Sequence, residues 1–188
     1  MKYLMEKNQK TKLIFLDYDG VVNNLIFHTI DGEPDFYYRP LNEYSGLDRQ
    51  VNDFQAVAWL NKICREFNCK VVVTSTWRGR DDYAECLYRA GFKGEIIGRT
   101  PWLGTKRGKE IFVWLNKEEN QNRVKDIDDF IILDDDADME MYMPHLIQTN
   151  TYRGLGFEEY QKICKRWEGD KNEQVSEKSE NKVKRTSI

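Results

Sequence analysis

Short runs of consecutive apolar residues, each followed closely by polar or turn-forming residues, mark five predicted β-strands. A strand buried on both faces of a sheet reads as a continuous apolar run, whereas a half-buried strand alternates apolar and polar residues. The clearest runs are of the first kind and are rich in β-branched side chains. We predict strands over residues 13–16, 69–74, 95–98, 130–133 and 146–149.

Between these strands, apolar residues recur at spacings of three and four, which is the period of an amphipathic helix. One such helix is predicted over 51–67, and others over 81–89, 107–116 and 156–167. The almost wholly polar segment 117–129 is predicted to be a surface connection. Strands that alternate with helices indicate a parallel sheet with helices on both faces. The predicted fold class is therefore α/β, a three-layer Rossmann-like arrangement around five parallel strands.

Three segments show neither pattern. Residues 24–49 contain the turn-forming sequence DGEP and many aromatic residues. A long irregular segment beside a strand end is often a lid or recognition flap, and the other interpretation is a loop packed on the sheet edge. Residues 168–188 are charged with almost no apolar side chains, so we predict a disordered or loosely helical tail. Residues 1–12 form a polar leader without the apolar core of a signal peptide, and 13–167 form the domain.

The composition agrees with a single domain and a tail, since a domain commonly has about 100–200 residues and the chain has 188. The formal charge is only −3, so no overall positive field indicates nucleic acid as an obligatory partner, and the oligomeric state is left open. No run approaches about 18 apolar residues, which argues against a membrane-spanning helix. The four cysteines form no CxxC motif, which favours reduced, buried thiols in a cytoplasmic protein.

The end of the first predicted strand carries Asp17 and Asp19, with Gly20 directly after them. In an open α/β sheet, ligands bind at the carboxyl ends of the strands. Two like charges about 4 Å apart repel by roughly 4 kcal/mol at an effective dielectric constant of about 20. A divalent cation would offset this repulsion, and carboxylate oxygens suit Mg²⁺.

Three further polar groups adjoin predicted strands or open a helix, and all four groups fit one chemistry. They are the hydroxyl cluster 74–76, the basic residues of 106–109 and the acidic run 134–138. Carboxylates hold a hard cation, hydroxyl and cationic groups hold an anion, and an aspartate can attack phosphorus as a nucleophile. Because the groups occur in this order beside apolar strands, the sequence indicates a phosphoryl-transfer site.

The phrases LDYDGVVN, VVVTST and FIILDDDAD also carry a resemblance to a known family. They are similar to the first, second and fourth motifs of the haloacid dehalogenase-like (HAD) superfamily, and the likeness spans residues 13–157. The phrases TSTWR and RGKEIxxWL look like a subgroup of small superfamily members, and the HAD domains associated with RNA repair are a more distant likeness. The resemblance implies a HAD-like fold and a phosphohydrolase that uses Mg²⁺.

The resemblance also implies a role for each matching residue. Asp17 would be the nucleophile that forms an aspartyl-phosphate, and one of its oxygens would bind Mg²⁺. Asp19 would protonate the leaving group and later activate water, while its backbone carbonyl binds the metal. Asp134 would complete the metal site, with Asp135 or Asp138 binding the metal or supporting a metal-bound water. An aspartate at the second position suits a phosphatase, since the dehalogenases of this superfamily lack it.

Two phosphate-binding positions depart from the family pattern. The hydroxyl is that of Thr74 if the strand ends at residue 73, and that of Ser75 if the strand runs one residue further. The third motif normally supplies a lysine, but Arg107 occupies the equivalent place here, with Lys106 and Lys109 as alternatives. Arginine can hold a phosphoryl group through two parallel hydrogen bonds, so the exchange is compatible with activity.

Cap insertions separate the members of the superfamily, and residues 24–49 leave room for a small flap but not for a large cap domain. Members without a cap tend to act on large substrates, so we expect a phosphorylated substrate of unknown type, with nucleotides or nucleic acid as candidates. The leading interpretation is a Mg²⁺-dependent phosphatase. The alternatives are a signalling receiver domain that accepts a phosphoryl group and a binding protein that keeps the metal site without catalysis.

Overall fold

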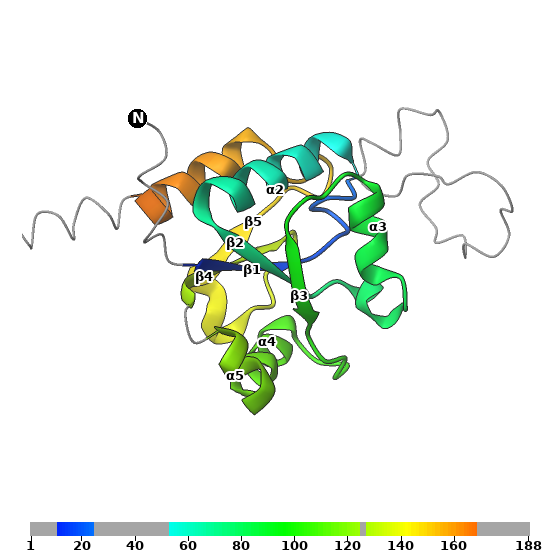
Figure 1. The fold of residues 1–188 in the computed structure, drawn as a ribbon, viewed down its shortest axis with the longest axis vertical. Helices are drawn as coiled ribbons and strands as arrows, with labels where there is room; N and C mark the ends of the chain where they lie inside the picture. The colour runs from blue at the N-terminus through cyan, green and yellow to red at the C-terminus, as the bar shows by residue number, and fades with distance from the viewer. Residues whose placement is uncertain (1–10, 25–52, 125–126, 169–188) are drawn as a thin grey trace, which may run out of the picture.

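A five-stranded sheet lies at the centre of the fold, in the order β3-β2-β1-β4-β5, and every neighbouring pair is parallel (Figure 1). The structure is a computed structural model, and it describes residues 11–24, 53–124 and 127–168. The predicted α/β fold with five parallel strands is confirmed. The strands are β1 (Thr11–Leu16), β2 (Cys69–Val73), β3 (Glu95–Arg99), β4 (Ile127–Asp134) and β5 (Leu146–Gln148).

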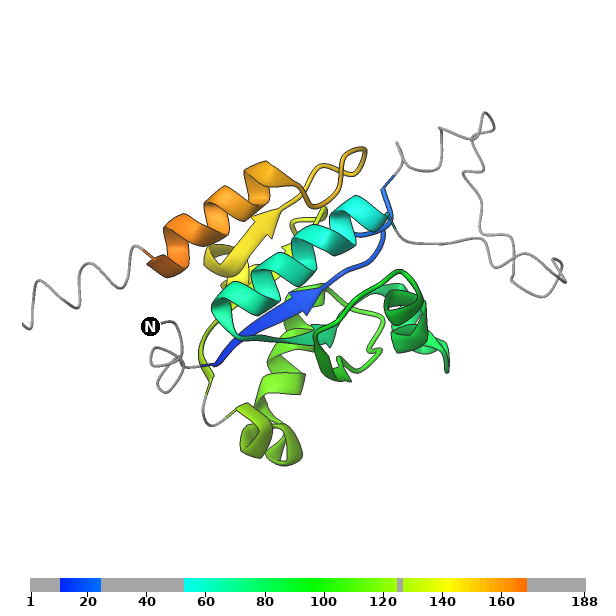
Figure 2. The ribbon, with the colours of Figure 1, turned by 45° about the horizontal axis from the view of Figure 1, so that its top comes forward.

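Helices cover both faces of this sheet, which makes three layers (Figures 1 and 2). Helix α2 (Phe54–Phe67) and the helix over 157–168 lie side by side on one face. Helix α3 (Tyr83–Arg89) packs into the same hydrophobic cluster as α2. Helices α4 (Arg107–Asn116) and α5 (Glu118–Val124) lie on the opposite face.

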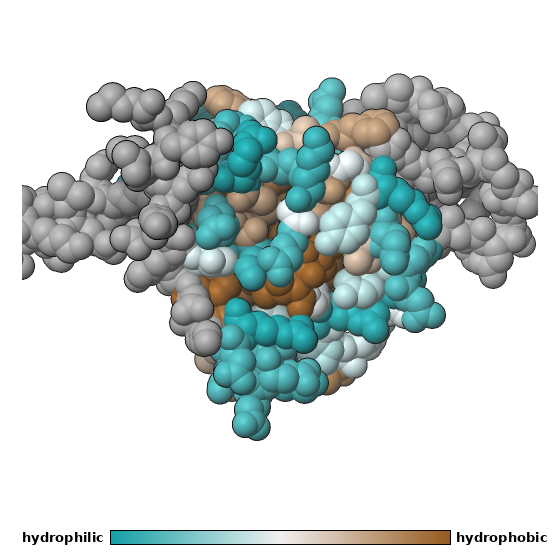
Figure 3. Space-filling model, in the orientation of Figure 1, coloured by the Kyte–Doolittle hydropathy of each residue, from teal (hydrophilic) through white to brown (hydrophobic). Residues whose placement is uncertain are grey.

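The side chains of β1 alternate between these two faces, as the pleat of a strand requires. Ile14 and Leu16 belong to the cluster with α2, whereas Leu13 and Phe15 pack with Trp114 of α4. All four are fully buried, which explains why this strand is a continuous apolar run. Figure 3 shows hydrophobic residues at the level of the sheet, between the hydrophilic surfaces of the two helical layers.

The residues on either side of 25–52 lie close together, beside the end of β1. Asn24 is buried, and its Nδ2 donates a hydrogen bond of 2.6 Å to Oδ2 of Asp53. Asp53 also caps α2, because its Oδ1 accepts from the backbone N–H of Gln55 at 2.7 Å. The predicted flap lies outside the described residues except for Asn24, as does the predicted tail beyond residue 168.

The structure corrects the prediction for residues 117–129. This segment forms helix α5 and the first three residues of β4, where a surface connection was expected. Helix α5 has no apolar stripe to reveal it, but Glu118 and Glu119 lie in its first turn and Arg123 in its last. These charges complement the helix dipole, and the Asn120 amide fastens the helix to the carbonyl of Trp114 at 3.0 Å.

Smaller differences concern element ends. Strand β1 begins at Thr11, inside the predicted leader, and the 3₁₀ helices η2 (Thr76–Gly79) and η3 (Glu140–His145) were not predicted.

Of the four thiols, three are buried and that of Cys164 is partly exposed, and none is in a disulfide. Within the described ranges, no helix combines the length and apolar character needed to cross a membrane.

Candidate active site

Three polar residues continue the inner strands onto the α4 side of the sheet. Leu16, Val73 and Leu133 are paired neighbours in β1, β2 and β4, and all three pack on the α2 side. Because successive side chains alternate, the next residues, Asp17, Thr74 and Asp134, turn toward α4. Main-chain hydrogen bonds keep this register past the ends of β1 and β2, from Asp17 N to Leu133 O (2.9 Å) and from Thr74 N to Leu16 O (2.8 Å).

A third carboxylate joins Asp17 and Asp134 because residue 20 is glycine. Gly20 has φ of 71°, and a Cβ there would lie 2.2 Å from Cγ of Asp135. Oδ2 of Asp135 also accepts a hydrogen bond of 2.6 Å from the hydroxyl of Thr151. Asp17, Asp134 and Asp135 each offer one oxygen within 4.8 Å of the others, an arrangement that could hold a metal ion.

The donor chemistry of this cluster fits a hard divalent cation. Carboxylate oxygens are the ligands that Mg²⁺ and Ca²⁺ prefer. Among the described residues, six buried side-chain atoms have no hydrogen-bonding partner, and four belong to this site: those of Thr74, Arg107, Asp134 and Asp138. Buried polar atoms in native proteins are normally satisfied, so their concentration here indicates groups arranged for a bound cation and anion.

The two remaining predicted acids lie outside the three-carboxylate cluster. Asp19 accepts hydrogen bonds from Nε1 of Trp77 in η2 (2.9 Å) and from Nδ2 of Asn23 (2.5 Å). Oδ2 of Asp138 accepts from the backbone N–H of Arg107 at 3.0 Å, so this carboxylate caps the first turn of α4. Asp138 therefore lies beside Arg107, the first residue of α4, and this hydrogen bond helps to orient Arg107.

Arg107 is the basic residue that reaches the carboxylates. Its Nη2 lies 3.6 Å from Oδ2 of Asp17, and its Nε lies 3.3 Å from Oδ2 of Asp134. Lys106 points to Glu140 at 3.9 Å with its side chain mostly exposed, and Lys109 is exposed. Of the three third-motif candidates, the geometry therefore selects Arg107.

Gly108 makes the approach of Arg107 possible. A Cβ at this position would lie 2.2 Å from the carbonyl oxygen of Met139, in the segment that follows the acidic run after β4. Any larger residue would push the start of α4 away from that segment. The sequence RG at the start of α4 therefore combines a cation with the close contact that positions it.

The two candidate hydroxyls have different surroundings. β2 ends at Val73, which is the register in which Thr74 takes the phosphate-binding position. The Thr74 hydroxyl is buried and has no hydrogen-bonding partner within the described part of the chain. The Ser75 hydroxyl accepts from the backbone N–H of Trp77 at 3.3 Å and also bonds to Asp17, so it is already engaged.

Burial dominates the electrostatics of the carboxylates. It raises the pKa of Asp17 to about 6, although Arg107 opposes the shift. Burial, together with the nearby charge of Asp17, raises the pKa of Asp134 to about 8. Burial acts to lower the pKa of Arg107, but the two carboxylates outweigh it and raise that pKa. Carboxyls this costly to ionise are typical of functional sites, where a bound cation favours the charged form.

A buried ion pair that the sequence did not reveal supports the hydroxyl loop. Arg78 and Glu110 are bonded through Nη2 and Oε2, and each side chain is only 4% exposed. Nη1 of Arg78 donates to the carbonyls of Thr74 and Ser75, at 2.8 Å to the latter. Arg78 follows the hydroxyl cluster with only Trp77 between them, which was a usable signal, but nothing in the pattern of α4 marked Glu110.

The comparisons with known proteins give one family. A family model described as the HAD domain in Swiss Army Knife RNA repair proteins matches residues 13–159. No curated protein and no solved structure matches the chain. The family match covers the candidate active-site residues, and it confirms the predicted HAD-like hydrolase and its α/β fold. The RNA-repair domains, rated above as the more distant likeness, are the family shown: this chain belongs to the HAD domains of Swiss Army Knife RNA repair proteins.

Proposed function

We propose that the protein is a Mg²⁺-dependent phosphomonoesterase that removes a terminal phosphate from RNA through an aspartyl-phosphate on Asp17. One observation carries the proposal: Arg107 lies between Asp17 and Asp134, with Asp135 completing a three-carboxylate cluster. A cluster of anions and one buried cation suits a substrate that is itself an anion bound beside a metal ion.

The reaction has two displacements at phosphorus. In the first, an oxygen of Asp17 forms a bond to phosphorus, the ester P–O bond breaks, and Asp19 gives its proton to the departing hydroxyl oxygen. In the second, Asp19 takes a proton from water, the water oxygen bonds to phosphorus, and the acyl-phosphate bond breaks. Inorganic phosphate and free Asp17 are the products, and Asp19 is again protonated.

The other residues hold the phosphoryl group in place. Arg107 donates to its oxygens from the α4 side, and the buried Thr74 hydroxyl donates from the end of β2. Trp77 and Asn23 fix the carboxylate of Asp19. Asp17, Asp134 and Asp135 would hold Mg²⁺, which when bound neutralises charge on the carboxylates and on the transferring phosphoryl group. The family description supports RNA as the substrate.

The proposal is tested with wild type and Asp17→Asn in the presence of Mg²⁺. We expect the wild type to hydrolyse p-nitrophenyl phosphate and to remove phosphate from the end of an RNA oligonucleotide, and Asp17→Asn to lose both activities while its circular dichroism spectrum is retained. Equal turnover by both proteins contradicts the mechanism. A stable phosphorylated wild type without turnover would instead indicate a receiver-type phosphoacceptor.

A further inference from the structure

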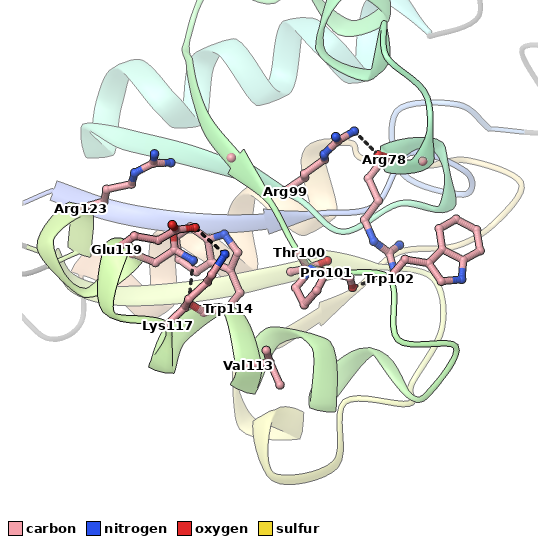
Figure 4. Close-up of a pocket in the computed structure, with 13 residues that line it drawn as sticks. Arg78, Arg99, Thr100, Pro101, Trp102, Val113, Trp114, Lys117, Glu119 and Arg123 are labelled. Carbon is pink, nitrogen blue, oxygen red and sulfur yellow. Dashed lines mark hydrogen bonds and ion pairs between the residues drawn. The ribbon is translucent and has the colours of Figure 1, made fainter.

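A pocket of about 460 Å³ lies between the end of β3 and helices α4 and α5 (Figure 4). This volume is within the range of pockets that bind drug-sized ligands, about 300–1,000 Å³. None of the residues that line this pocket has a catalytic, metal-binding or phosphate-binding role in the proposed function. Its two ends differ in chemistry: Trp102 lies at one end, and charged side chains of the α4–α5 connection and of α5 lie at the other (Figure 4).

The Trp102 end offers a flat, exposed aromatic surface. Trp102 is 59% exposed, although its side chain is one of the largest apolar ones. The guanidinium of Arg78 lies 5.0 Å from the ring centroid, and a Cβ at Gly79 would lie 3.4 Å from the ring. Arg78 and Gly79 thus support the ring while much of the residue stays open to solvent. An aromatic ring supported in this way is a stacking platform for a planar group.

The other end carries positive charge. Arg123 donates from Nη1 to the carbonyl of Ile97 at 2.7 Å, and Lys117 pairs with Glu119 at 2.6 Å on the surface. Arg123 forms no salt bridge among the described residues, so its guanidinium keeps donors for an anion. Arg78 and Arg99 also line the pocket, which gives it four cationic residues and one acidic residue in a chain of net charge −3.

A buried hydroxyl lies between the two ends. Thr100 is only 2% exposed, lines the pocket, and has a hydroxyl without a hydrogen-bonding partner among the described residues. A buried hydroxyl without a hydrogen-bonding partner is unfavourable, because it has lost its hydrogen bonds to water. A polar ligand atom would satisfy it. The pocket therefore combines a stacking surface, a hydroxyl and cations within one small volume.

We propose that this pocket binds a short segment of single-stranded RNA, with one base stacked on Trp102 at one end and a backbone phosphate held by Arg123 and Lys117 at the other. Single-stranded RNA repeats a flat ring and an anion along one chain, so it can reach both ends of the pocket. This inference extends the proposed function, because it gives the active site a separate subsite for the RNA strand. Arg78 connects the two, since it lines the pocket and also donates to the carbonyls of Thr74 and Ser75.

Binding is measured without turnover, in the Asp17→Asn protein and, as a second background, in wild type with EDTA. The probes are a fluorescently labelled, phosphorylated single-stranded RNA, followed by anisotropy, and unlabelled adenosine monophosphate as competitor. Trp102→Ala and Arg123→Gln should each weaken RNA binding about tenfold, as is typical for loss of one stacking or phosphate contact. Trp102→Phe should restore most of the affinity, because it keeps an aromatic face.

Arg89→Gln is the matched control, since Arg89 is an exposed arginine on α3, which packs with α2 in the other helical layer. It should bind RNA like the parent protein. Competition by unlabelled RNA, with adenosine monophosphate competing only at much higher concentration, supports the RNA strand as the ligand. Adenosine monophosphate that competes at the same concentration as RNA would show that one nucleotide accounts for the binding and would overturn the assignment. Unchanged RNA affinity in Trp102→Ala and Arg123→Gln, or equal binding of an acidic peptide, would overturn it.

Failure of the catalytic proposal is distinguishable from failure of the subsite. A wild type that does not hydrolyse p-nitrophenyl phosphate contradicts the phosphatase but leaves the binding result intact. If the phosphatase is active, the ratio of kcat/KM for RNA to that for p-nitrophenyl phosphate should fall about tenfold in Trp102→Ala. A ratio equal to that of wild type would show that the pocket contributes nothing to substrate choice.

Discussion

A Cβ on Gly20 would lie 2.2 Å from Cγ of Asp135, so these two residues can hold their positions only while residue 20 has no side chain. The glycine of the DxDG sequence thus does more than turn the chain after β1. It leaves the space into which the acidic run after β4 inserts its second carboxylate. The segments that follow β1 and β4, which are far apart in the sequence, are therefore in close contact at Gly20 and Asp135.

Gly20→Ala should therefore displace Asp135 and weaken metal binding. A positive φ at a non-glycine residue costs about 1–2 kcal/mol, and the clash adds to this cost. We expect a lower Tm, at least tenfold weaker Mg²⁺ binding by isothermal titration, and loss of phosphatase activity. Gly91→Ala is the control, because Gly91 has φ of 93° with nothing within 4 Å of its Cβ position. Gly91→Ala should also lower Tm, because its backbone strain is of the same kind, but it should bind Mg²⁺ like wild type.

Glu110→Gln should strongly destabilise the fold, because it leaves Arg78 buried without a counter-charge. Removing one partner of a buried ion pair commonly costs about 3–5 kcal/mol. Urea denaturation monitored by tryptophan fluorescence measures the change. Glu158→Gln is the matched control, since Glu158 and Arg153 form a pair whose side chains are 73% exposed. That change should cost less than about 1 kcal/mol, and equal effects of the two substitutions would contradict the structural role of the Arg78–Glu110 pair.

Asp134→Asn should stabilise the metal-free protein at neutral pH. The folded-state pKa of Asp134 is about 8 against an ordinary 3.8, so between these values the folded state binds more protons than the unfolded state. Stability conferred by protonated Asp134 is thus present below about pH 4 and is lost as the pH rises through about 8. Asparagine carries no charge, so Tm measured in EDTA from pH 5 to 9 should fall less steeply.

The same substitution should abolish any rise in Tm on adding Mg²⁺. Asp136→Asn is the control: Asp136 is exposed two residues away, and only its backbone N–H bonds to Asp134. It should behave like wild type in both measurements. A metal-free Asp134→Asn protein that is less stable than wild type at pH 8 would show that Asp134 is not strained by its burial.

Thr74→Val should lower activity without lowering stability, whereas Ser75→Ala should lower stability. This difference identifies which of the two hydroxyls binds the phosphate. Thr74→Val removes a buried hydroxyl for which the described residues offer no partner, so Tm should stay or rise. The value of kcat/KM should fall about 10²-fold, as for other lost oxyanion donors. Ser75→Ala removes the cap of η2 and should lower stability by about 1 kcal/mol. The phosphatase assay and a thermal melt together decide; a larger loss of activity in Ser75→Ala would reverse the assignment.

The sheet and most of the acidic site were predictable from the sequence, for a physical reason. A strand buried on both faces must be continuously apolar, so the polar residues that follow β1 and β4 stand out. Parallel strands place their carboxyl ends at one edge, which brings Asp17 and Asp134 together without knowledge of any other contact. Strand β2 ends at Val73, which is the register that favours Thr74 of the two hydroxyl alternatives left open by the sequence.

What the sequence left open depends on packing between distant elements. Arg107, Lys106 and Lys109 are equivalent as charges, and which of them turns toward the carboxylates depends on how the start of α4 packs against the segment after β4, where Gly108 lies close to Met139. Helix α5 has no apolar period, so its position over the end of β3, and hence the pocket with Arg123, came only from the structure. Asp138, expected to bind the metal or to support a metal-bound water, lies at the start of α4, where its carboxylate accepts a hydrogen bond from the backbone N–H of Arg107.

The hydrogen bond between Asn24 and Asp53 has a consequence for how this domain diversifies. It joins the two positions between which residues 25–52 are inserted, so the catalytic edge is closed independently of what the insertion contains. Loop-closure entropy grows only with the logarithm of length. Segments of different length and composition can therefore be exchanged at this junction, in evolution or by protein engineering, while the arrangement of the site residues is kept.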